Sequence, residues 1–350
     1  MILSDPRARL TTFAIAGAGA GVFVLAGLPL PVLLGPMLAC LLAALFGVKM
    51  HGAGAVGTFM RTFLGLAVGT SITPAVVGQL PGMALSLAFV PLFITMIGLV
   101  GYPLFRFGFR MDHATAWYGA MPGGLQDMII FGEEAGGDPR ALSLIHATRV
   151  LVIVTVAPFI MVQSWDVDLT RAPGPPANDM DPMQLGLMIF AAVAGWRIAA
   201  RAGLFGASIL GPMILAAILS LSGLLHQRPP AEIIWAAQFF IGIALGVKYT
   251  GITLRELRTV VGAGLVYAVF LALISMVFIE AVILTGIAPG LDAFLAFLPG
   301  GQAEMVVIAI MVGADLAYVV SHHLLRVVIV ILLAPIAARL FGGTDRDGHR

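Results

Sequence analysis

The segment Pro122-Gly-Gly-Leu-Gln-Asp-Met128 decides how this chain is interpreted, because it returns 177 residues later as Pro299-Gly-Gly-Gln-Ala-Glu-Met305. The two copies lie inside apolar stretches, at 114–132 and at 292–311. Proline lacks an amide hydrogen and breaks a helix, and two successive glycines allow the chain to reverse sharply. Each copy therefore predicts the tip of a re-entrant or broken helical hairpin.

The rest of the chain repeats with the same spacing. Three further blocks recur in the same order at an offset of 176 or 177 residues, and chance matches would not stay in register. The sequence therefore predicts an internal duplication. The matched blocks are Leu33–Met37 with Ile209–Met213, Gly65 and Gly69 with Gly242 and Gly246, and His146, Arg149, Ala157 and Pro158 with His323, Arg326, Ala334 and Pro335.

The composition predicts an all-α polytopic membrane protein. Hydrophobic residues make up 60% of the chain and charged residues 11%, whereas a soluble protein carries roughly 25% charged residues. The mean hydropathy is +1.03. The net charge of +1 offers no basic face for nucleic acid, and Cys40 is the only cysteine, so no intrachain disulfide can form. A soluble enzyme, a DNA-binding module and a secreted disulfide scaffold are excluded.

Ten stretches are predicted to be membrane-crossing helices, which need about 20 mostly apolar residues each. We expect the first to be a structural helix and not a cleavable signal peptide, because it recurs within the duplication. We expect a first membrane repeat at 1–163, a periplasmic linker at 164–182, and a second repeat at 183–350 with a short cytoplasmic tail. The ten stretches lie near 10–28, 31–48, 58–79, 83–105, 140–162, 184–202, 206–224, 233–250, 260–285 and 316–338.

The positive charges distinguish two orientations of the repeats. The halves would be parallel if both Pro-Gly-Gly stretches crossed the bilayer, and inverted if both entered and returned on the same side. Lysine and arginine favour the cytoplasmic side. With cytoplasmic termini, the inverted arrangement places 15 of the 19 Lys and Arg residues in the cytoplasm, against 11 for the parallel one, and leaves only Arg171 and Arg228 outside. We predict two inverted five-helix repeats in the bacterial inner membrane.

The hairpin tips form the predicted binding site. Irregular backbone at membrane depth must line a cavity or be buried in protein, and a broken helix exposes free N–H groups and partial positive charge at its new N-terminus. Such ends form the binding sites of many inverted-repeat transporters. The alternative is a kink that binds nothing. The predicted site residues at the tips are Pro122, Gly123, Gly124, Gln126, Asp127, Pro299, Gly300, Gly301, Gln302 and Glu304.

Charged residues occur at matching positions in both halves. Asp127 and Glu304 each follow the first glycine by four residues, and ionisable groups inside a membrane are costly and usually functional. Arg149 and Arg326 could form neutral pairs with these acids and hold the hairpins in place. Alternatively, one acid titrates while an arginine binds an anionic substrate. The two alternatives are compatible.

His146 and His323 precede these arginines by three residues, on the same helix face. A proton relay and a hydrogen-bonded core histidine are both open. His322 and His323 have no accompanying ligand set, so we predict neither a metal nor another cofactor. Asp138 and Asp315 each stand just before a predicted span, where a helix N-cap is expected.

The duplicated motifs resemble the bacterial AbrB-type membrane protein family, which is unrelated to the soluble DNA-binding regulator of that name. The resemblance covers nearly the whole chain and rests on Leu-Gly-Pro-Met at 34–37 and 210–213, together with Pro-Gly-Gly-x-x-acid-Met at 122–128 and 299–305. It implies a membrane location, an internal duplication, and a label of gene-expression regulator or ammonia monooxygenase, with no catalytic residue. The architecture is also similar to inverted-repeat secondary transporters with re-entrant hairpins, such as citrate and glutamate symporters.

We therefore expect a secondary transporter of a small anionic or zwitterionic solute, coupled to H⁺ or Na⁺, and not an enzyme. The expected partners are the lipid bilayer and the solute, with no nucleic acid, and the glycine-rich helix faces leave a homodimer open. The alternative is a membrane regulator or sensor that acts through a protein partner. A channel ranks below both. An ammonia monooxygenase ranks last, because clustered metal ligands are not found in the sequence.

Overall fold

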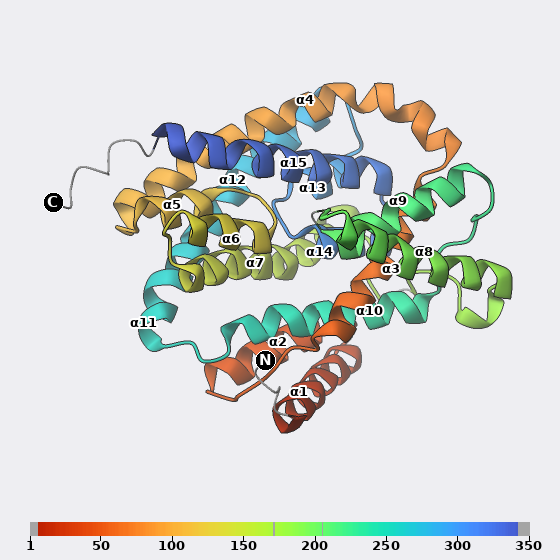
Figure 1. Ribbon diagram of the computed structural model, residues 1–350, viewed down its shortest axis with the longest axis horizontal. Coiled ribbons are helices and arrows are strands. Elements are labelled where there is room, and N and C mark those ends of the chain that lie inside the picture. Colours follow the sequence, from red (N-terminus) through yellow and green to blue (C-terminus); the bar gives the residue numbers. More distant parts are fainter. Residues whose placement is uncertain (1–5, 171, 205, 342–350) are drawn as a thin grey trace. The chain divides into compact units, whose positions relative to one another are not determined.

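The computed structural model describes residues 6–170, 172–204 and 206–341, and their regular structure is helical throughout (Figure 1). Arg171 of the expected linker and the expected tail beyond 341 lie outside the described residues. The helices of the first half are α1 (Pro6–Leu25), α2 (Pro31–Leu45), α3 (Ala55–Ser71), α4 (Pro74–Pro103), η1 (Leu104–Gly108), α5 (His113–Ala120), α6 (Leu125–Glu134) and α7 (Pro139–Trp165). Those that follow are η2 (Ala177–Asp179), α8 (Pro182–Arg201), α9 (Ala207–Leu221), α10 (Ala231–Gly246), η3 (Val247–Tyr249), α11 (Leu254–Glu256), η4 (Leu257–Val261), α12 (Gly262–Leu284), α13 (Gly290–Phe297), α14 (Gln302–Val312) and α15 (Leu316–Phe341).

Seven helical stretches among the described residues are long and apolar enough to cross a membrane, so the chain is a multi-pass membrane protein. Three of the ten predicted spans, at 31–48, 58–79 and 206–224, fall short of that length. Their helices α2, α3 and α9 have 15, 17 and 15 residues. At a rise of 1.5 Å per residue, 15 residues reach roughly 22 Å, less than the approximately 30 Å of a hydrocarbon core.

The boundary between the third and fourth predicted spans also differs. α3 ends at Ser71, and α4 begins at Pro74 and runs for 30 residues to Pro103. Proline is tolerated in the first turn of a helix, where its missing amide hydrogen has no intrahelical partner to lose. The chain therefore turns before Pro74, and residues 74–79 belong to the following helix.

The chain forms two compact units, and each is assembled from both halves of the sequence. The first unit comprises the chain up to Gly82, Val154–Ile252 and Ala303–Val320. The second comprises Met83–Ile153, Thr253–Gln302 and the chain from Ser321. The two expected repeats are stretches of sequence, so their boundaries stay a prediction.

In the first unit, glycines let α3 approach α9 at backbone distance. A Cβ atom added at Gly65 would overlap the carbonyl oxygen of Ile209, and one added at Gly69 would overlap that of Met213. Because both contact positions advance together along the two helices, α3 and α9 run in the same direction. Small residues at such interfaces are what close helix packing in membranes requires.

The same contact is made a second time between α10 and α2. A Cβ atom added at Gly242 would overlap the carbonyl oxygen of Leu33, and one added at Gly246 would lie 2.6 Å from that of Met37. These helices also run in the same direction. The matched glycine pairs therefore serve helix packing within the chain, and each half supplies the glycines for one contact and the carbonyls for the other.

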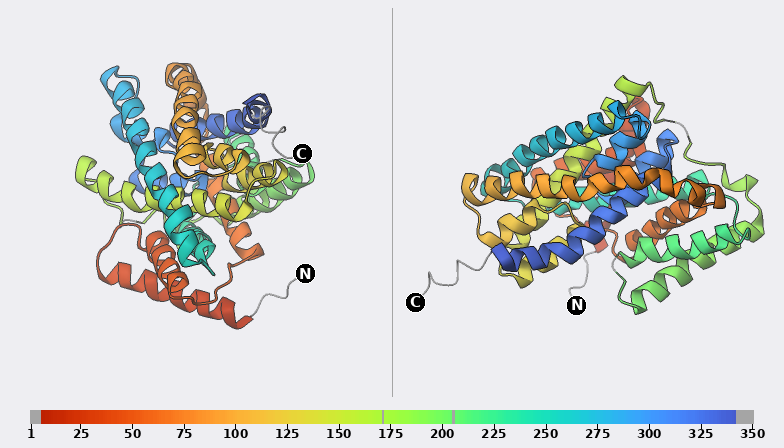
Figure 2. Two further views of the ribbon diagram at one scale, coloured as in Figure 1. Left: turned by 90° about the vertical axis from the view of Figure 1, so that its left-hand side faces the viewer. Right: turned by 90° about the horizontal axis from the view of Figure 1, so that it is seen from above.

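In the second unit, α4 and α12 lie side by side (Figure 2). The rings of Phe93 and Phe278 meet edge to face with centroids 5.1 Å apart, and Phe93 also contacts Phe297 of α13 at 5.6 Å. Aromatic pairs in this geometry contribute about 0.5–1.5 kcal/mol beyond their buried area. This aromatic contact joins helices from both sequence halves.

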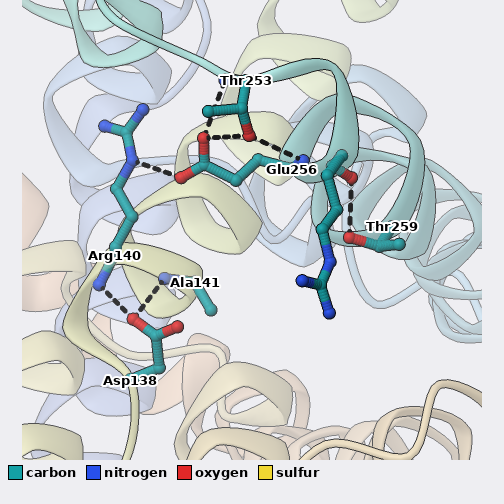
Figure 3. Close-up of polar contacts among 7 residues, drawn as sticks. Asp138, Arg140, Ala141, Thr253, Glu256 and Thr259 are labelled. Carbon is teal, nitrogen blue, oxygen red and sulfur yellow. Dashed lines mark hydrogen bonds and ion pairs between the residues drawn. The ribbon is translucent and has the colours of Figure 1, made fainter.

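The beginnings of α7 and α11 are joined by a polar cluster (Figure 3). Arg140 Nε lies 2.9 Å from Glu256 Oε1. Glu256 also accepts the amide hydrogen of Thr253 at 2.8 Å, and the Thr253 hydroxyl oxygen accepts that of Glu256 at 3.1 Å, which forms a capping box. Asp138 caps α7 by accepting the amide hydrogens of Arg140 and Ala141 at 2.8 and 3.1 Å.

The matching residue Asp315 caps α15 in the same way. It accepts the amide hydrogens of Ala317 and Tyr318 at 2.9 and 3.1 Å. The N-caps predicted at Asp138 and Asp315 are therefore both confirmed.

Replacing Gly69 or Gly246 by alanine should destabilise the protein by roughly 1–3 kcal/mol, because the new methyl group meets backbone atoms that cannot move aside. The matched control is Gly186→Ala in α8, where no atom lies within 4 Å of the added Cβ. That change should be neutral or stabilise by up to about 1 kcal/mol through helix propensity. Thermal unfolding in detergent measures both, and shifts of one sign at all three positions would contradict the packing account.

Candidate functional site

The first Pro-Gly-Gly break forms the tip of a broken helical hairpin in the second unit. α5 has 8 residues and α6 has 10, so the arms reach roughly 12 and 15 Å and neither can cross a bilayer. The beginning of α5 lies close to the segment that follows α6, because the Asp138 amide donates a hydrogen bond to Thr115 Oγ1 at 2.8 Å. In Figure 1 the two arms lie beside α7. The predicted broken helical hairpin is confirmed here, whereas its entry into the membrane from one side stays a prediction.

The second break has arms of similar length. α13 has 8 residues and α14 has 11, and residues 298–301 between them are not helical. α14 belongs to the first unit from Ala303 onward, whereas α13 and the break belong to the second. As in the first half, the interrupted segment consists of two helices, each too short to span a membrane.

Arg149 of α7 binds the carbonyl groups of the first break. Its Nη1 donates to Met121 O and its Nη2 to Gly123 O, both at 3.3 Å. The side chain is 1% exposed. These carbonyls follow the end of α5, where a helix leaves its last four C=O groups without an intrahelical partner. The guanidinium also places positive charge at the negative end of the α5 dipole.

Arg326 of α15 does the same at the second break. Its Nη1 donates to Leu298 O at 3.2 Å and its Nη2 to Gly300 O at 3.0 Å, and the side chain is 3% exposed. Each donor and each acceptor is related to its counterpart in the first half by 177 residues. We refer to these two sets of bonds as the arginine clamps.

The two histidines complete the clamps. His146 Nε2 lies 3.0 Å from Tyr118 O, and His323 Nε2 lies 2.9 Å from Leu295 O, again at matched positions. Arg326 Nη2 lies 3.1 Å from His323 Nδ1, and because an arginine can only donate, the His323 proton is on Nε2. Of the two alternatives, this geometry is that of a hydrogen-bonded core histidine that binds the last turn of the neighbouring arm.

The acids are placed differently from the arginines. Asp127 is the third residue of α6, half-buried, and its Oδ2 has no hydrogen-bond partner among the described residues. Glu304 is the third residue of α14, 8% exposed, and belongs to the first unit. Each acid therefore lies in the first turn of a helix that starts at a break, where negative charge is stabilised.

The remaining predicted site residues lie at the tips. Pro122, Gly123, Pro299 and Gly300 are buried, Gly124 and Gly301 are half-buried, and Gln126 is exposed. Gln302 is half-buried, and its Nε2 has no partner among the described residues. A Cβ atom added at Gly123 would lie 2.9 Å from Val330 Cγ1, so the first tip packs against α15, the helix that carries Arg326. The structure thus brings the first tip to the arginine helix of the other half.

Two polar contacts near the tips were not predicted. The Tyr267 hydroxyl donates to Ala120 O at the end of α5. Ser86 Oγ and His322 Nε2 lie 2.8 Å apart in a buried position. An isolated tyrosine in the apolar stretch 260–285 is the signal that could have indicated the first contact, because a buried phenol needs a partner.

Replacing Arg149 or Arg326 by glutamine should destabilise the protein by about 3 kcal/mol or more at either position, because two charge-assisted hydrogen bonds of about 1.5–3 kcal/mol each are lost. Lysine at either position should restore only part of the lost stability, since it lacks the planar guanidinium group that reaches two carbonyls. The exposed Arg201→Gln serves as control and should change stability by less than about 0.5 kcal/mol. Denaturant unfolding in detergent is the measurement. Equal stability of the glutamine variants, the lysine variants and the Arg201→Gln control would show that the clamps do not hold the breaks.

Residues 32–342 match the family described as "Transition state regulatory protein AbrB". The chain is similar to an uncharacterized protein, YhjN, of Bacillus subtilis (strain 168), with 27% identity over 93% of this chain and 91% of the relative. It is also similar to a protein of Escherichia coli (strain K12) that is named as a candidate regulator, AbrB, with 25% identity over 91% of each. Since the family match covers most of the sequence, this membrane protein belongs to the AbrB family.

Proposed function

We propose that the protein is a secondary transporter of a small anionic or zwitterionic solute, coupled to H⁺ or Na⁺, in the bacterial inner membrane with both termini in the cytoplasm. Its two repeats are inverted, and transport proceeds by alternating access around the hairpin tips. No catalytic step is part of this function.

The directions of four helices support the inverted arrangement. α3 runs parallel to α9, and α10 runs parallel to α2, because the contact positions of the glycines advance in the same direction along both helices of each pair. α2 and α3 are joined by the connection 46–54, and we take them to run in opposite directions, as consecutive membrane segments do. α9 is the counterpart of α2 and α10 the counterpart of α3. Each counterpart therefore runs opposite to its equivalent, as inverted repeats demand.

The observation that carries the proposal is the unpartnered carboxylate oxygen of Asp127 beside the first break. A carboxylate oxygen that is buried without a hydrogen-bond donor is costly unless it binds a proton or a cation. Asp127 lies in the first turn of α6, whose free N–H groups favour an anionic group of a solute. A proton or Na⁺ on the acid and an anionic group on the N–H groups would occupy neighbouring positions.

The arginine clamps supply the rigid part of this site. Their guanidinium groups bind carbonyl groups that directly follow α5 and α13, the first arms of the two hairpins. These bonds hold each break in place next to the end of its first arm. The second arms, α6 and α14, each carry one glutamine and one acid in their first turn. In this proposal the arginines stabilise the hairpins through the carbonyl groups, and Asp127 and Glu304 respond to the solute and the coupling ion.

The test uses full-length protein in proteoliposomes that enclose a pH-sensitive dye. Individual organic acids and amino acids are added outside, with and without a Na⁺ gradient, and uptake of each labelled solute is measured in parallel. At least one solute should drive a flux in the wild type. Asp127→Asn keeps the size of the side chain but removes its charge, and should lower coupled uptake at least tenfold.

Glu133→Gln is the matched control, because Glu133 is an exposed acid on the same helix. It should transport as the wild type does. Coupled uptake that survives in Asp127→Asn would refute the assignment of the acid. Failure of every solute and both gradients in the wild type would refute transport itself.

A membrane regulator is the second candidate, and the names of the family and of the E. coli relative favour it. Its partner would be a protein that contacts the basic residues near 248–258, such as Arg255 of α11 and Arg258 of η4. Cross-linking from an Arg255→Cys variant in intact cells that captures one partner protein, together with inactive proteoliposomes, would favour regulation over transport.

A further inference from the structure

A cavity of about 550 Å³ lies within the second unit, beside the first hairpin tip. Ligand pockets in proteins commonly have volumes of this order. It is bounded by α4, by α5 and by α15. The residues that line it include Leu99, Tyr102, Trp117, Met121, Val330 and Leu333.

The cavity is apolar and opens toward lipid. α4 and α15 belong to stretches that are long and apolar enough to cross a membrane. Two of their residues that line the cavity, Leu99 and Leu333, are 65% and 55% exposed. Exposed apolar side chains on such helices face hydrocarbon, so an acyl chain is the molecule available to enter.

One end of the cavity has the character of a membrane interface. Tyr102 shares a hydrogen bond of 2.8 Å with His113 Nδ1, and the His113 and Trp117 rings stack at 6.5 Å. Tyrosine and tryptophan are enriched at the headgroup level of membranes. Arg106 follows Tyr102 by one helical turn and donates to Met111 O at 3.1 Å, and Arg110 beyond it is exposed. This end therefore presents positive charge beside an apolar cavity.

The other wall of the cavity is the hairpin tip itself. Met121 O accepts the hydrogen bond from Arg149. Val330 lies against Gly123. An acyl chain in the cavity would therefore fill space directly behind the first break and limit the movement of the tip.

We propose that this cavity binds one acyl chain of an anionic phospholipid, whose phosphate group lies near Arg106 and Arg110. The apolar wall selects a hydrocarbon chain, and the basic end selects the negative headgroup. Arg110 is the more exposed of the two, since Arg106 already donates to Met111 O. An arginine near a membrane surface contributes an attraction that corresponds to about a fivefold change in affinity, so we expect a fivefold preference that rests on Arg110. The bound lipid stabilises the first hairpin.

The test uses full-length protein in detergent micelles with Trp117 as its sole tryptophan. The probe is phosphatidylglycerol with brominated acyl chains, which quench tryptophan fluorescence on contact, and brominated phosphatidylcholine is the neutral comparison. Quenching of Trp117 should saturate, with about fivefold higher affinity for phosphatidylglycerol. The other tryptophans, each replaced by phenylalanine, are Trp165, Trp196 and Trp235.

Two variants distinguish the binding of the acyl chain from the binding of the lipid headgroup. Ala337→Phe fills the cavity and should weaken quenching at least fivefold, whereas Ala88→Phe, an exposed position of α4 that does not line it, should not. Arg110→Gln should reduce the preference for phosphatidylglycerol to near equality. Thermal unfolding confirms that each variant is folded.

Three results would overturn the proposal. Quenching that is equal in Ala337→Phe and the wild type would place the lipid elsewhere. Quenching of a Trp235-only protein at the same lipid concentrations would mean unspecific partition. A dimer in sedimentation with Trp117 unquenched would mean that a second copy covers the cavity.

Discussion

The structure depends on how two interrupted helices keep the backbone groups of their breaks hydrogen-bonded in the interior of a membrane protein. Each break leaves carbonyl groups that neither a helix nor water can pair, and an unpaired carbonyl in hydrocarbon costs several kcal/mol. Arg149 and Arg326 resolve this by donating two hydrogen bonds each to the broken segment. An arginine suits the task because its planar fork reaches two carbonyls at once and its charge complements a helix C-terminus. Without these bonds, the Pro-Gly-Gly segments would have no defined position.

The glycine contacts of the first unit likewise use one sequence pattern twice. Each half contributes glycines to one helix pair and carbonyl oxygens to the other, so a single sequence pattern serves both contacts. A duplicated chain that packs in this reciprocal way obtains both interfaces from one motif, as a symmetric dimer does from one surface. The clamps of the second unit repeat at the same offset. Both units therefore preserve the duplication, although each combines segments of both halves.

Features set by neighbouring residues were predictable, and features set by distant ones were not. The breaks at Pro122 and Pro299 and the caps at Asp138 and Asp315 follow from local rules, and the structure has them. The arginines were expected to meet either the acids or a ligand, yet the partners of Arg326 are carbonyls 26 and 28 residues away. Which groups an arginine binds depends on how the hairpin packs against the helix. The spacing of residues in the sequence does not contain this information. The short helices α2 and α9 were overestimated because their flanking loops are also apolar.

The central claim is that the two clamped hairpins enter the membrane from opposite sides. Glu134 and Met311 are equivalent positions, 177 residues apart. Glu134 is the last residue of α6, and Met311 lies one residue before the end of α14. Single cysteines at these positions, in a protein whose Cys40 is replaced by serine, can be labelled in intact cells with a membrane-impermeant maleimide. The account predicts that the cysteine at 311 reacts from outside and the one at 134 reacts only after the membrane is opened. Labelling of both from the same side would contradict it.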